Sequence, residues 1–478
     1  MNEVDQIETL NSLAEVASRR ERPREGSRLA SVRVSPGSYL AAASVLTFVS
    51  GLLLRSERDI YALAVVALAW LVIPLLAWRD RIEFDGAALS RRGFAPALLR
   101  LLGIGPKKLR LEQFERVETQ AVRTIKKGGK VRYRYRTQIA GRKVEFTFAS
   151  GGKSYRNMVR QLFPLIHDDK MDLRTIELRD YLCDPKELDA EVNELQLASS
   201  DVLETATPDF KLGGSKRSGS DGVADPDGEP AMEPGRALLL GELGSKLRVA
   251  GRLAEAREAF RRALTAFPND GRLLFEFSRL LRSQASSAGD AKLLQRSRAA
   301  LRLAAQRAAA EPGLLTSIGE IFLEWGELNA ARRNLQKASA MEPRNFKARV
   351  GLANLALRDG KLAHVINQYR DASMAASDKA LVDYARREAD YYAQLNDDDD
   401  YLNSELRRIN WLQHSLRIRR LAARVTNASI LVALVAAYFD SSFAGICWSL
   451  ATSSLFAWVL SLFGIKLLGR RSTPRLVE

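Results

Sequence analysis

The sequence has little of the chemistry that enzyme active sites and metal centres commonly use. Its 478 residues include three histidines, His167, His364 and His414. None of them has a second candidate ligand three or four positions away, as a helical metal site would need. No Ser/His/Asp or Cys/His pattern is visible either. The sequence therefore predicts no catalytic residue, no metal ligand, no cofactor site and no enzyme.

Cysteine is scarce, and a secretory signal is not visible. Cys183 lies in a polar region and Cys447 in an apolar run, so the two suggest no disulfide framework, which fits a reducing compartment. The first residues are acidic, arginines follow, and the first apolar run begins only near Ser38. A secretory signal would place its apolar core much earlier and would end at a small-residue cleavage site.

Long apolar runs, in contrast, are present in two pairs. The first pair is 39–54 and 60–78, and the second is 425–439 and 443–465. Each run approaches the roughly 20 residues that cross ~30 Å of hydrocarbon, so we expect two transmembrane helical hairpins. The alternative for the first pair is a buried hairpin in a soluble core. The alternative for the second, whose first run is short, is a shallow or re-entrant hairpin.

Arginine-rich segments flank all four runs. The chain carries 73 Lys and Arg against 57 Asp and Glu, a net charge of +16. Arginines precede the first run, follow the second, precede the third and follow the fourth, whereas the two connecting turns are neutral or acidic. The positive-inside rule then places both termini and the segment 80–424 in the cytoplasm. We therefore expect a multi-pass protein of the cell (inner) membrane.

Between the hairpins, residues 79–166 show the alternation typical of β-strands. Tyr133 and Tyr135 alternate with Arg134 and Arg136, which places tyrosines and arginines on opposite faces of one strand. A helical pattern closes the segment. Several short strands closed by one helix, directly after a two-span hairpin, resemble the pleckstrin-homology-like (PH-like) domains of small bacterial membrane proteins. The resemblance implies a small, mostly-β barrel on the cytoplasmic face of the membrane.

This segment is also strongly basic, because residues 81–170 hold 21 Lys or Arg against eight Asp or Glu. Two interpretations stay open: a solvated sheet face without a ligand, and contact with anionic lipid headgroups. A third, contact with nucleic acid, is disfavoured because a tethered domain has little access to it. The predicted anionic-surface residues are Lys126, Lys127, Lys130, Arg132, Arg134, Arg136, Arg142 and Lys143.

From Ala237 onward the sequence repeats a helix-pair pattern, with Gly326 and Gly360 at equivalent turns 34 residues apart. The matching positions are Leu240, Leu243, Gly244, Leu247, Gly251, Ala256, Phe260, Ala263 and Pro268 in the first copy, and Leu315, Ile318, Gly319, Phe322, Gly326, Ala331, Leu335, Ala338 and Pro343 in the third. The pattern resembles the tetratricopeptide repeat (TPR), an all-α solenoid of stacked helix pairs. The second copy is longer than this period, which indicates lengthened helices or a longer loop.

In TPR proteins the first helix of each pair lines a concave groove, so the resemblance implies a cytoplasmic protein or peptide partner. The exposed first-helix positions that it picks out are Ser245, Arg248, Arg279, Arg282, Glu320, Glu324, Asn354 and Arg358. They do not reproduce the Lys/Asn set that grips a C-terminal carboxylate. The alternative is that these side chains are only solvated.

The fold class is thus a multi-domain integral membrane protein with two transmembrane hairpins, a mostly-β domain and an all-α solenoid. The predicted order is a cytoplasmic N-terminal segment 1–37, transmembrane hairpin 38–78, PH-like domain 79–166, helical extension 167–197, disordered linker 198–236, TPR-type solenoid 237–424, transmembrane hairpin 425–465 and cytoplasmic tail 466–478. Residues 401–424 contain no Gly or Pro and are expected to continue the solenoid into the third span.

These features favour a binding protein. We expect a membrane-anchored scaffold or adaptor that recruits a cytoplasmic partner through the TPR array, with the basic domain as a second contact at the membrane. The alternative is an auxiliary subunit of a membrane transport or envelope-assembly complex. A transport path would need polar residues within the spans, and only small ones such as Ser44, Thr47, Thr452 and Ser453 occur there.

Overall fold

The computed structural model of the protein describes residues 30–34, 37–94, 96–97, 108–125, 131–142, 144–149, 152–197, 234–439 and 441–469. Most of these residues are helical, and two small antiparallel sheets accompany the helices. The N-terminal segment up to residue 29, most of the predicted linker and the tail beyond 469 lie outside the described residues. So do Lys126, Lys127, Lys130 and Lys143.

Two sheets form a compact β domain. The first sheet consists of β1 (Ala30–Arg33), β2 (Arg81–Phe84), β3 (Ala88–Arg92) and β4 (Leu109–Arg110), and the second of β5 (Phe114–Ile125), β6 (Val131–Gly141) and β7 (Glu145–Ala149), each in that order. Strand β1 precedes the first hairpin in the chain and pairs with β2, which follows it. The hairpin therefore leaves and re-enters the same sheet, and β1 lies outside the range 79–166 predicted for this domain.

The interior of the β domain combines apolar side chains with a chain of hydroxyls. Helix α6 (Lys153–Leu162) is the predicted closing helix and covers the sheets with Tyr155, Met158, Val159 and Leu162, which are all buried. The Thr119 hydroxyl lies 3.0 Å from that of Thr137, and the latter lies 2.9 Å from the Tyr155 hydroxyl. Each buried hydroxyl thus has a hydrogen-bond partner, which removes the cost of burying it.

Nine helices in succession form the helical array. They are α10 (Pro234–Ala250), α11 (Leu253–Ala266), α12 (Gly271–Ala288), α13 (Ala291–Arg307), α14 (Pro312–Trp325), α15 (Leu328–Met341), α16 (Phe346–Arg358), α17 (Leu362–Ala375) and α18 (Lys379–Asp397). The long second copy consists of lengthened helices, of 18 and 17 residues, and Gly289 ends the first of them at a φ of 70°.

The array is held together by large side chains that pack against glycines of the neighbouring helix. Gly244 lies against the ring of Phe260, and Gly319 and Gly351 both lie against Leu335. Phe260 and Leu335 are fully buried, as are Ala256, Ala263, Ala331 and Ala338. The sequence prediction of these core positions is confirmed.

The apolar runs form two helical hairpins. The first consists of α2 (Gly37–Arg55), α3 (Asp59–Ala67), a π-helical turn (Leu68–Val72) and α4 (Ile73–Arg79), and the second of α19 (Asp399–Phe439) and α20 (Ser441–Leu468). Among the residues that the structure describes, two segments are long and apolar enough to cross a membrane, Asp59–Arg79 and Ser442–Ile465, and the apolar helix Tyr39–Gly51 is shorter. The 41 residues of α19 run unbroken from the array into the second hairpin, as the sequence indicated.

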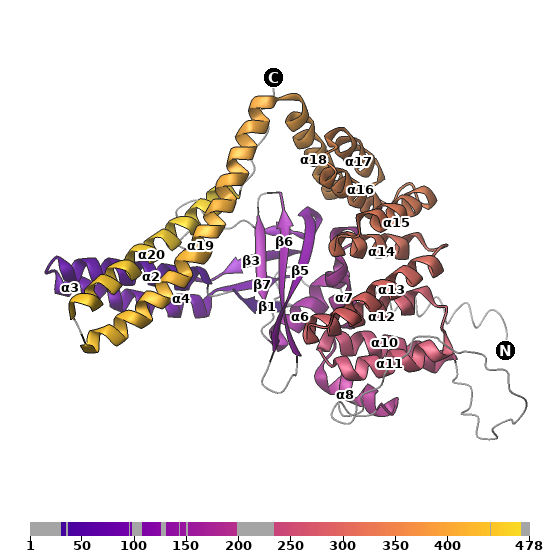
Figure 1. Ribbon diagram of the computed structural model, residues 1–478, viewed down its shortest axis with the longest axis horizontal. Coiled ribbons are helices and arrows are strands. Elements are labelled where there is room, and N and C mark those ends of the chain that lie inside the picture. The colour runs from indigo at the N-terminus through magenta and orange to yellow at the C-terminus, as the bar shows by residue number, and fades with distance from the viewer. Residues whose placement is uncertain are drawn as a thin grey trace, which may run out of the picture.

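Figure 1 shows that these parts enclose a triangle. The array runs along one side, α19 returns from its end along the second, and the β domain lies between the array and the hairpins. Helix α2 packs against α20, so the two hairpins form one bundle. The turns of both hairpins lie at the end of this bundle that points away from the β domain (Figure 1).

Asp80 joins the first hairpin to the β domain. Its carboxylate is fully buried and accepts a hydrogen bond of 2.5 Å from the Tyr39 hydroxyl of α2. The Arg91 Nε of β3 lies 3.0 Å from each of the two carboxylate oxygens and donates to both. Hydrogen bonding to Asp80, together with its charge, raises the pKa of Arg91 although burial opposes the rise. The base of the hairpin is therefore fixed to the sheet by a charged contact as well as by the strands.

The packing of Gly319 generates a test of the array. A Cβ at position 319 would lie 2.6 Å from Leu335 Cγ, whereas a Cβ at Gly313, near the start of the same helix, would meet nothing within 4 Å. Alanine is a better helix former than glycine by about 1 kcal/mol, but overpacking costs about 1–3 kcal/mol. We expect Gly319→Ala to lower the free energy of unfolding by about 1–2 kcal/mol and the control Gly313→Ala to leave it unchanged or raise it, as measured by urea unfolding. Equal effects of both substitutions would contradict the close packing.

Candidate functional site

The concave face of the array, where a partner was expected to bind, lies against the β domain. Helix α7 (Leu173–Tyr181) packs on α10 and forms ion pairs with α12 and α14, and helix α8 (Pro185–Glu194) packs on α10. Leu188 and Val192 of α8 belong to the same buried apolar core as Leu243 and Phe260 of the array. The predicted helical extension 167–197 therefore caps the first helix pair and holds the β domain beside the groove.

Ion pairs connect the two parts along the array. Arg174 of α7 lies 3.0 Å from Glu324 of α14. Farther along, the buried Lys170 lies 2.8 Å from Asp378 at the start of α18. Glu115 of β5 lies 2.7 Å from Arg387 within the same helix. The contact thus extends from the first helix of the array to the last.

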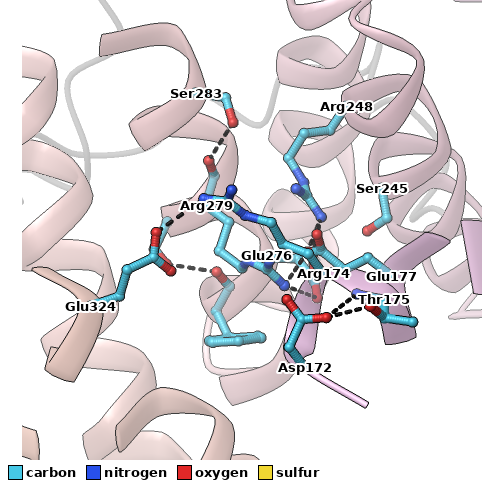
Figure 2. A network of polar contacts seen from close by, with 12 residues as sticks. Asp172, Arg174, Thr175, Glu177, Ser245, Arg248, Glu276, Arg279, Ser283 and Glu324 are labelled. Atoms are coloured by element: carbon cyan, nitrogen blue, oxygen red, sulfur yellow. Dashed lines mark hydrogen bonds and ion pairs between the residues drawn. The ribbon is translucent and has the colours of Figure 1, made fainter. Parts of the chain in front are cut away.

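Glu177 lies at the centre of this contact (Figure 2). Its carboxylate accepts a hydrogen bond of 2.6 Å from Arg248 of α10 and also pairs with Arg279 of α12. A second carboxylate, Glu276 of α12, lies 3.0 Å from Arg248. All four side chains are buried, so two helices of the array and one helix of the β domain share a charge cluster away from water.

The electrostatics of the cluster favour its charged form. Burial raises the pKa of Glu177, but the charges of Arg248 and Arg279 outweigh burial and hold the pKa below its ordinary value. Burial likewise lowers the pKa of Arg248, and Glu177 and Glu276 more than reverse the effect. Glu177 and Arg248 are therefore ionised at neutral pH, because each of these buried charges has an opposite charge beside it.

The cluster corrects the sequence prediction for three groove residues. Ser245, Arg248 and Arg279 were expected to be exposed, but their exposed fractions are 1%, 7% and 7%. The Ser245 hydroxyl donates to the Gly241 carbonyl of its own helix at 3.4 Å. The physical reason is that α7 and β6 cover this part of the groove: Tyr135 of β6 donates a hydrogen bond of 2.7 Å to the Val249 carbonyl.

The other five predicted groove residues remain accessible to different degrees. Arg282 is half-buried, with its guanidinium 5.1 Å from the centre of the Trp325 ring. Glu324 and Asn354 are exposed, and so is Arg358, which donates to the Leu323 carbonyl at 3.1 Å. Glu320 is half-buried. The accessible part of the predicted groove is therefore its later half, on α14 and α16.

Among the described residues, two cavities are found between the array and the β domain. The first, which we name the arginine cavity, measures about 340 Å³, and its charged and aromatic lining residues are Tyr133, Tyr135, Arg174, Glu177, Arg248, Arg279, Arg282, Glu324 and Trp325. The second measures about 350 Å³ and has a more acidic lining that includes Asp169, Asp172 and Glu320. Burial raises the pKa of Glu320 although Lys347 opposes the rise, and burial also raises the pKa of Asp172. The two cavities thus differ in charge.

The predicted anionic-surface residues are described only in part. Arg134, Arg136 and Arg142 are exposed, and the strand alternation of β6 is confirmed, since Tyr135 and Thr137 point the other way, into the protein. The side chain of Arg132 lies outside the described residues. The arginine face of β6 is therefore turned away from the array, and its contact with lipid stays a prediction.

The residues that connect the β domain to the array were not predicted from sequence patterns. Glu177, Lys170 and Tyr135 bond to residues 71, 208 and 114 positions further along the chain, at Arg248, Asp378 and Val249. The tyrosine alternation of β6 was the one available signal, because it marked a strand face that must be covered. No local pattern distinguishes Glu177 from a solvated helix residue.

Chemically, guanidinium, carboxylate, phenol and indole groups suit binding by charge and stacking. This is the interpretation that the described lining residues of the arginine cavity favour. No protein-family model matches the chain, and no curated protein matches it.

The buried position of Glu177 generates a second test. Glu177→Gln leaves Arg248 and Arg279 facing each other without their shared carboxylate, and breaking a buried ion pair costs about 3–5 kcal/mol. We expect a loss of this size in the free energy of unfolding at pH 7 for the full-length protein in detergent micelles. Because the pKa of Glu177 is lowered from 4.5, its stabilisation is complete above pH 4.5 and disappears as the pH falls toward the lowered pKa. The difference in free energy of unfolding between wild type and Glu177→Gln should therefore shrink as the pH falls below 4.5.

Glu324→Gln is the matched control. Glu324 also pairs with an arginine of α7, but the pair is largely exposed, so we expect a loss below about 1 kcal/mol. If Glu177→Gln costs no more than this control, the cluster does not hold the β domain on the array.

Proposed function

We propose that this protein is a multi-pass membrane scaffold whose helical array, of the TPR type, recruits a protein partner beside the bilayer. The repeat pattern supports the TPR assignment, because its apolar positions are buried between paired helices and its turn glycines Gly251, Gly326 and Gly360 have φ values of 88°, 80° and 73°. The split into two sheets with a covering helix supports a PH-like β domain.

Exposed apolar surface supports membrane insertion of both hairpins. Only 17% of the apolar window in Asp59–Arg79 and 22% of that in Ser442–Ile465 is buried inside the protein. Ile60, Leu63, Leu71 and Phe463 are each at least 68% exposed. Surface of this kind and extent is unfavourable in water and favourable in hydrocarbon. We infer four spans, inserted from the side on which the β domain lies.

The continuity of α19 is the observation that carries the scaffold proposal. This helix belongs to the array at its start and to the second hairpin at its end, while the β domain is joined to the first hairpin by β1, β2 and Asp80. The array is therefore connected to the bundle at both ends. An arrangement of this kind presents one protein surface at a constant place next to the membrane.

The surface offered to a partner is smaller than the sequence suggested. Since α7 and β6 cover Ser245, Arg248 and Arg279, the proposed contact is the accessible part of the groove on α14 and α16, with Glu324, Asn354 and Arg358. The exposed Arg134, Arg136 and Arg142 of the β domain are proposed to face anionic headgroups, each adding about 1 kcal/mol near such a surface.

Orientation is tested by labelling matched serines. Ser56, in the turn of the first hairpin, and Ser404, on α19 before the second, are both exposed and both donate to the carbonyl three residues earlier. With Cys183 and Cys447 replaced by alanine, we expect an impermeant maleimide to label Ser56→Cys in intact cells. Ser404→Cys should react only after permeabilisation, because the arginine-rich side stays in the cytoplasm. Labelling of Ser404→Cys in intact cells would reject the proposed orientation.

Recruitment is tested by site-specific photo-crosslinking of the full-length protein in its native membrane. A photoreactive side chain in place of Asn354 or Arg358 should capture the same partner, and one in place of the exposed Lys337 on α15 should not. Capture of an integral membrane complex would favour the alternative of an auxiliary subunit. Identical products from all three positions, or none from Asn354 and Arg358, would contradict a partner in the groove.

A further inference from the structure

We propose that the arginine cavity binds a small oxyanion, a phosphate or carboxylate group, at the junction between the array and the β domain. The cavity is built by β6 and α7 on one side and by α10, α12 and α14 on the other. Its volume of about 340 Å³ falls within the range of about 300–1,000 Å³ that small-molecule sites occupy. Three further observations on its lining residues indicate the charge of the ligand.

The first observation is an excess of cations. Four arginines line the cavity, and they face the carboxylates of Glu177 and Glu324, with Glu276 behind them. Glu177 pairs with Arg248 and Arg279, and Glu324 pairs with Arg174. Arg282 has no carboxylate within ion-pair distance among the described residues. The cavity therefore holds one more positive charge than its carboxylates balance.

The second observation is a buried donor without an acceptor. The side chain of Arg248 is 8% exposed, and its Nε has no hydrogen-bond partner, although its Nη2 donates to Glu177 and Glu276. Buried N–H groups almost always have a partner, and leaving one without an acceptor is destabilising. Solvent does not reach this atom, so an anion bound in the cavity would accept its hydrogen bond only once the Arg248 guanidinium turns toward the cavity.

The third observation is that the side chain of Arg282 is already held in a fixed position. Its guanidinium lies 5.1 Å from the centre of the Trp325 ring, so cation–π attraction holds the side chain in place before any ligand arrives. A planar guanidinium held in this way can bind two oxygens of a phosphate or carboxylate at once. Trp325 and Tyr133 add aromatic walls, which suit a ring carried by the same ligand.

The position of the cavity gives the ligand a structural effect. It would touch residues of the array and of the β domain together, so it would bind only while these are docked. A ligand that binds one state alone stabilises that state by an amount that grows with the logarithm of its concentration once the concentration exceeds the dissociation constant. Oxyanion binding should therefore raise the melting temperature of the whole chain.

The experiment uses the full-length protein in detergent micelles and three probes at constant ionic strength: inorganic phosphate, phenyl phosphate and a hexaglutamate peptide. Binding is followed by calorimetry and by the melting temperature. We expect saturable binding of at least one probe, with phenyl phosphate tighter than phosphate. Arg282→Gln should weaken that binding at least tenfold, and Arg282→Lys should restore it only in part, because lysine keeps the charge without the planar fork.

Arg344→Gln is the control, since Arg344 is exposed in the turn between α15 and α16, outside the cavity. Arg282 makes no ion pair among the described residues but does contact the Trp325 ring, so its variants should melt slightly below wild type in the absence of the probes, and binding is compared by the probe-induced shift of each variant. Binding of the two phosphates identifies a free anion as the source of the oxyanion, and binding of hexaglutamate alone identifies an acidic protein segment. No saturable binding of any probe at millimolar concentration, or equal binding by wild type and Arg282→Gln, would overturn the proposal. Neither result depends on whether α16 recruits a partner.

Discussion

The relation between the β domain and the helical array depends on the charge of one carboxylate, that of Glu177. Placing a carboxylate away from water costs several kcal/mol unless opposite charges and hydrogen bonds meet it. Here Arg248 and Arg279 come from two consecutive first helices of the array, so the charge is satisfied only when α7 lies across both. The cluster therefore fixes register and orientation more than it adds net stability.

The remaining contacts follow from this arrangement. With α7 held across α10 and α12, Tyr135 reaches the end of α10 and Lys170 reaches the start of α18. Much of the interface consists of such charged and polar pairs, and two cavities interrupt it. An interface of this composition resembles a contact between separate proteins more than the core of one domain. Apolar packing is concentrated at α8, which shares the core of the first helix pair.

Local patterns were sufficient to predict the buried positions within single helix pairs and within the covering helix, but not the contacts between distant segments. The periodic positions of the array, such as Phe260 and Leu335, and the covering helix with Tyr155 and Leu162 could be read from spacing, because each packs within its own supersecondary unit. Strand β1 was not predicted, because its four residues are too few to show an alternating pattern. Its partner strand β2 lies on the far side of the first hairpin in the sequence. The spacing correctly predicts that Arg248 lies on the groove-lining face of its helix. It does not predict that α7 covers this face, because that contact depends on tertiary structure alone.

Helix α19 has a mechanical consequence. At 1.5 Å per residue its 41 residues form a rod of about 60 Å, which joins the far end of the array to the apolar bundle. The β domain joins the near end of the array to the same bundle, so the three members close a triangular frame (Figure 1). A triangle with rigid sides cannot change one angle without deforming a side or opening a joint. In the proposed membrane arrangement, a change of tilt between the two hairpins would therefore be transmitted through α19 and the β domain to the charged joint at Glu177.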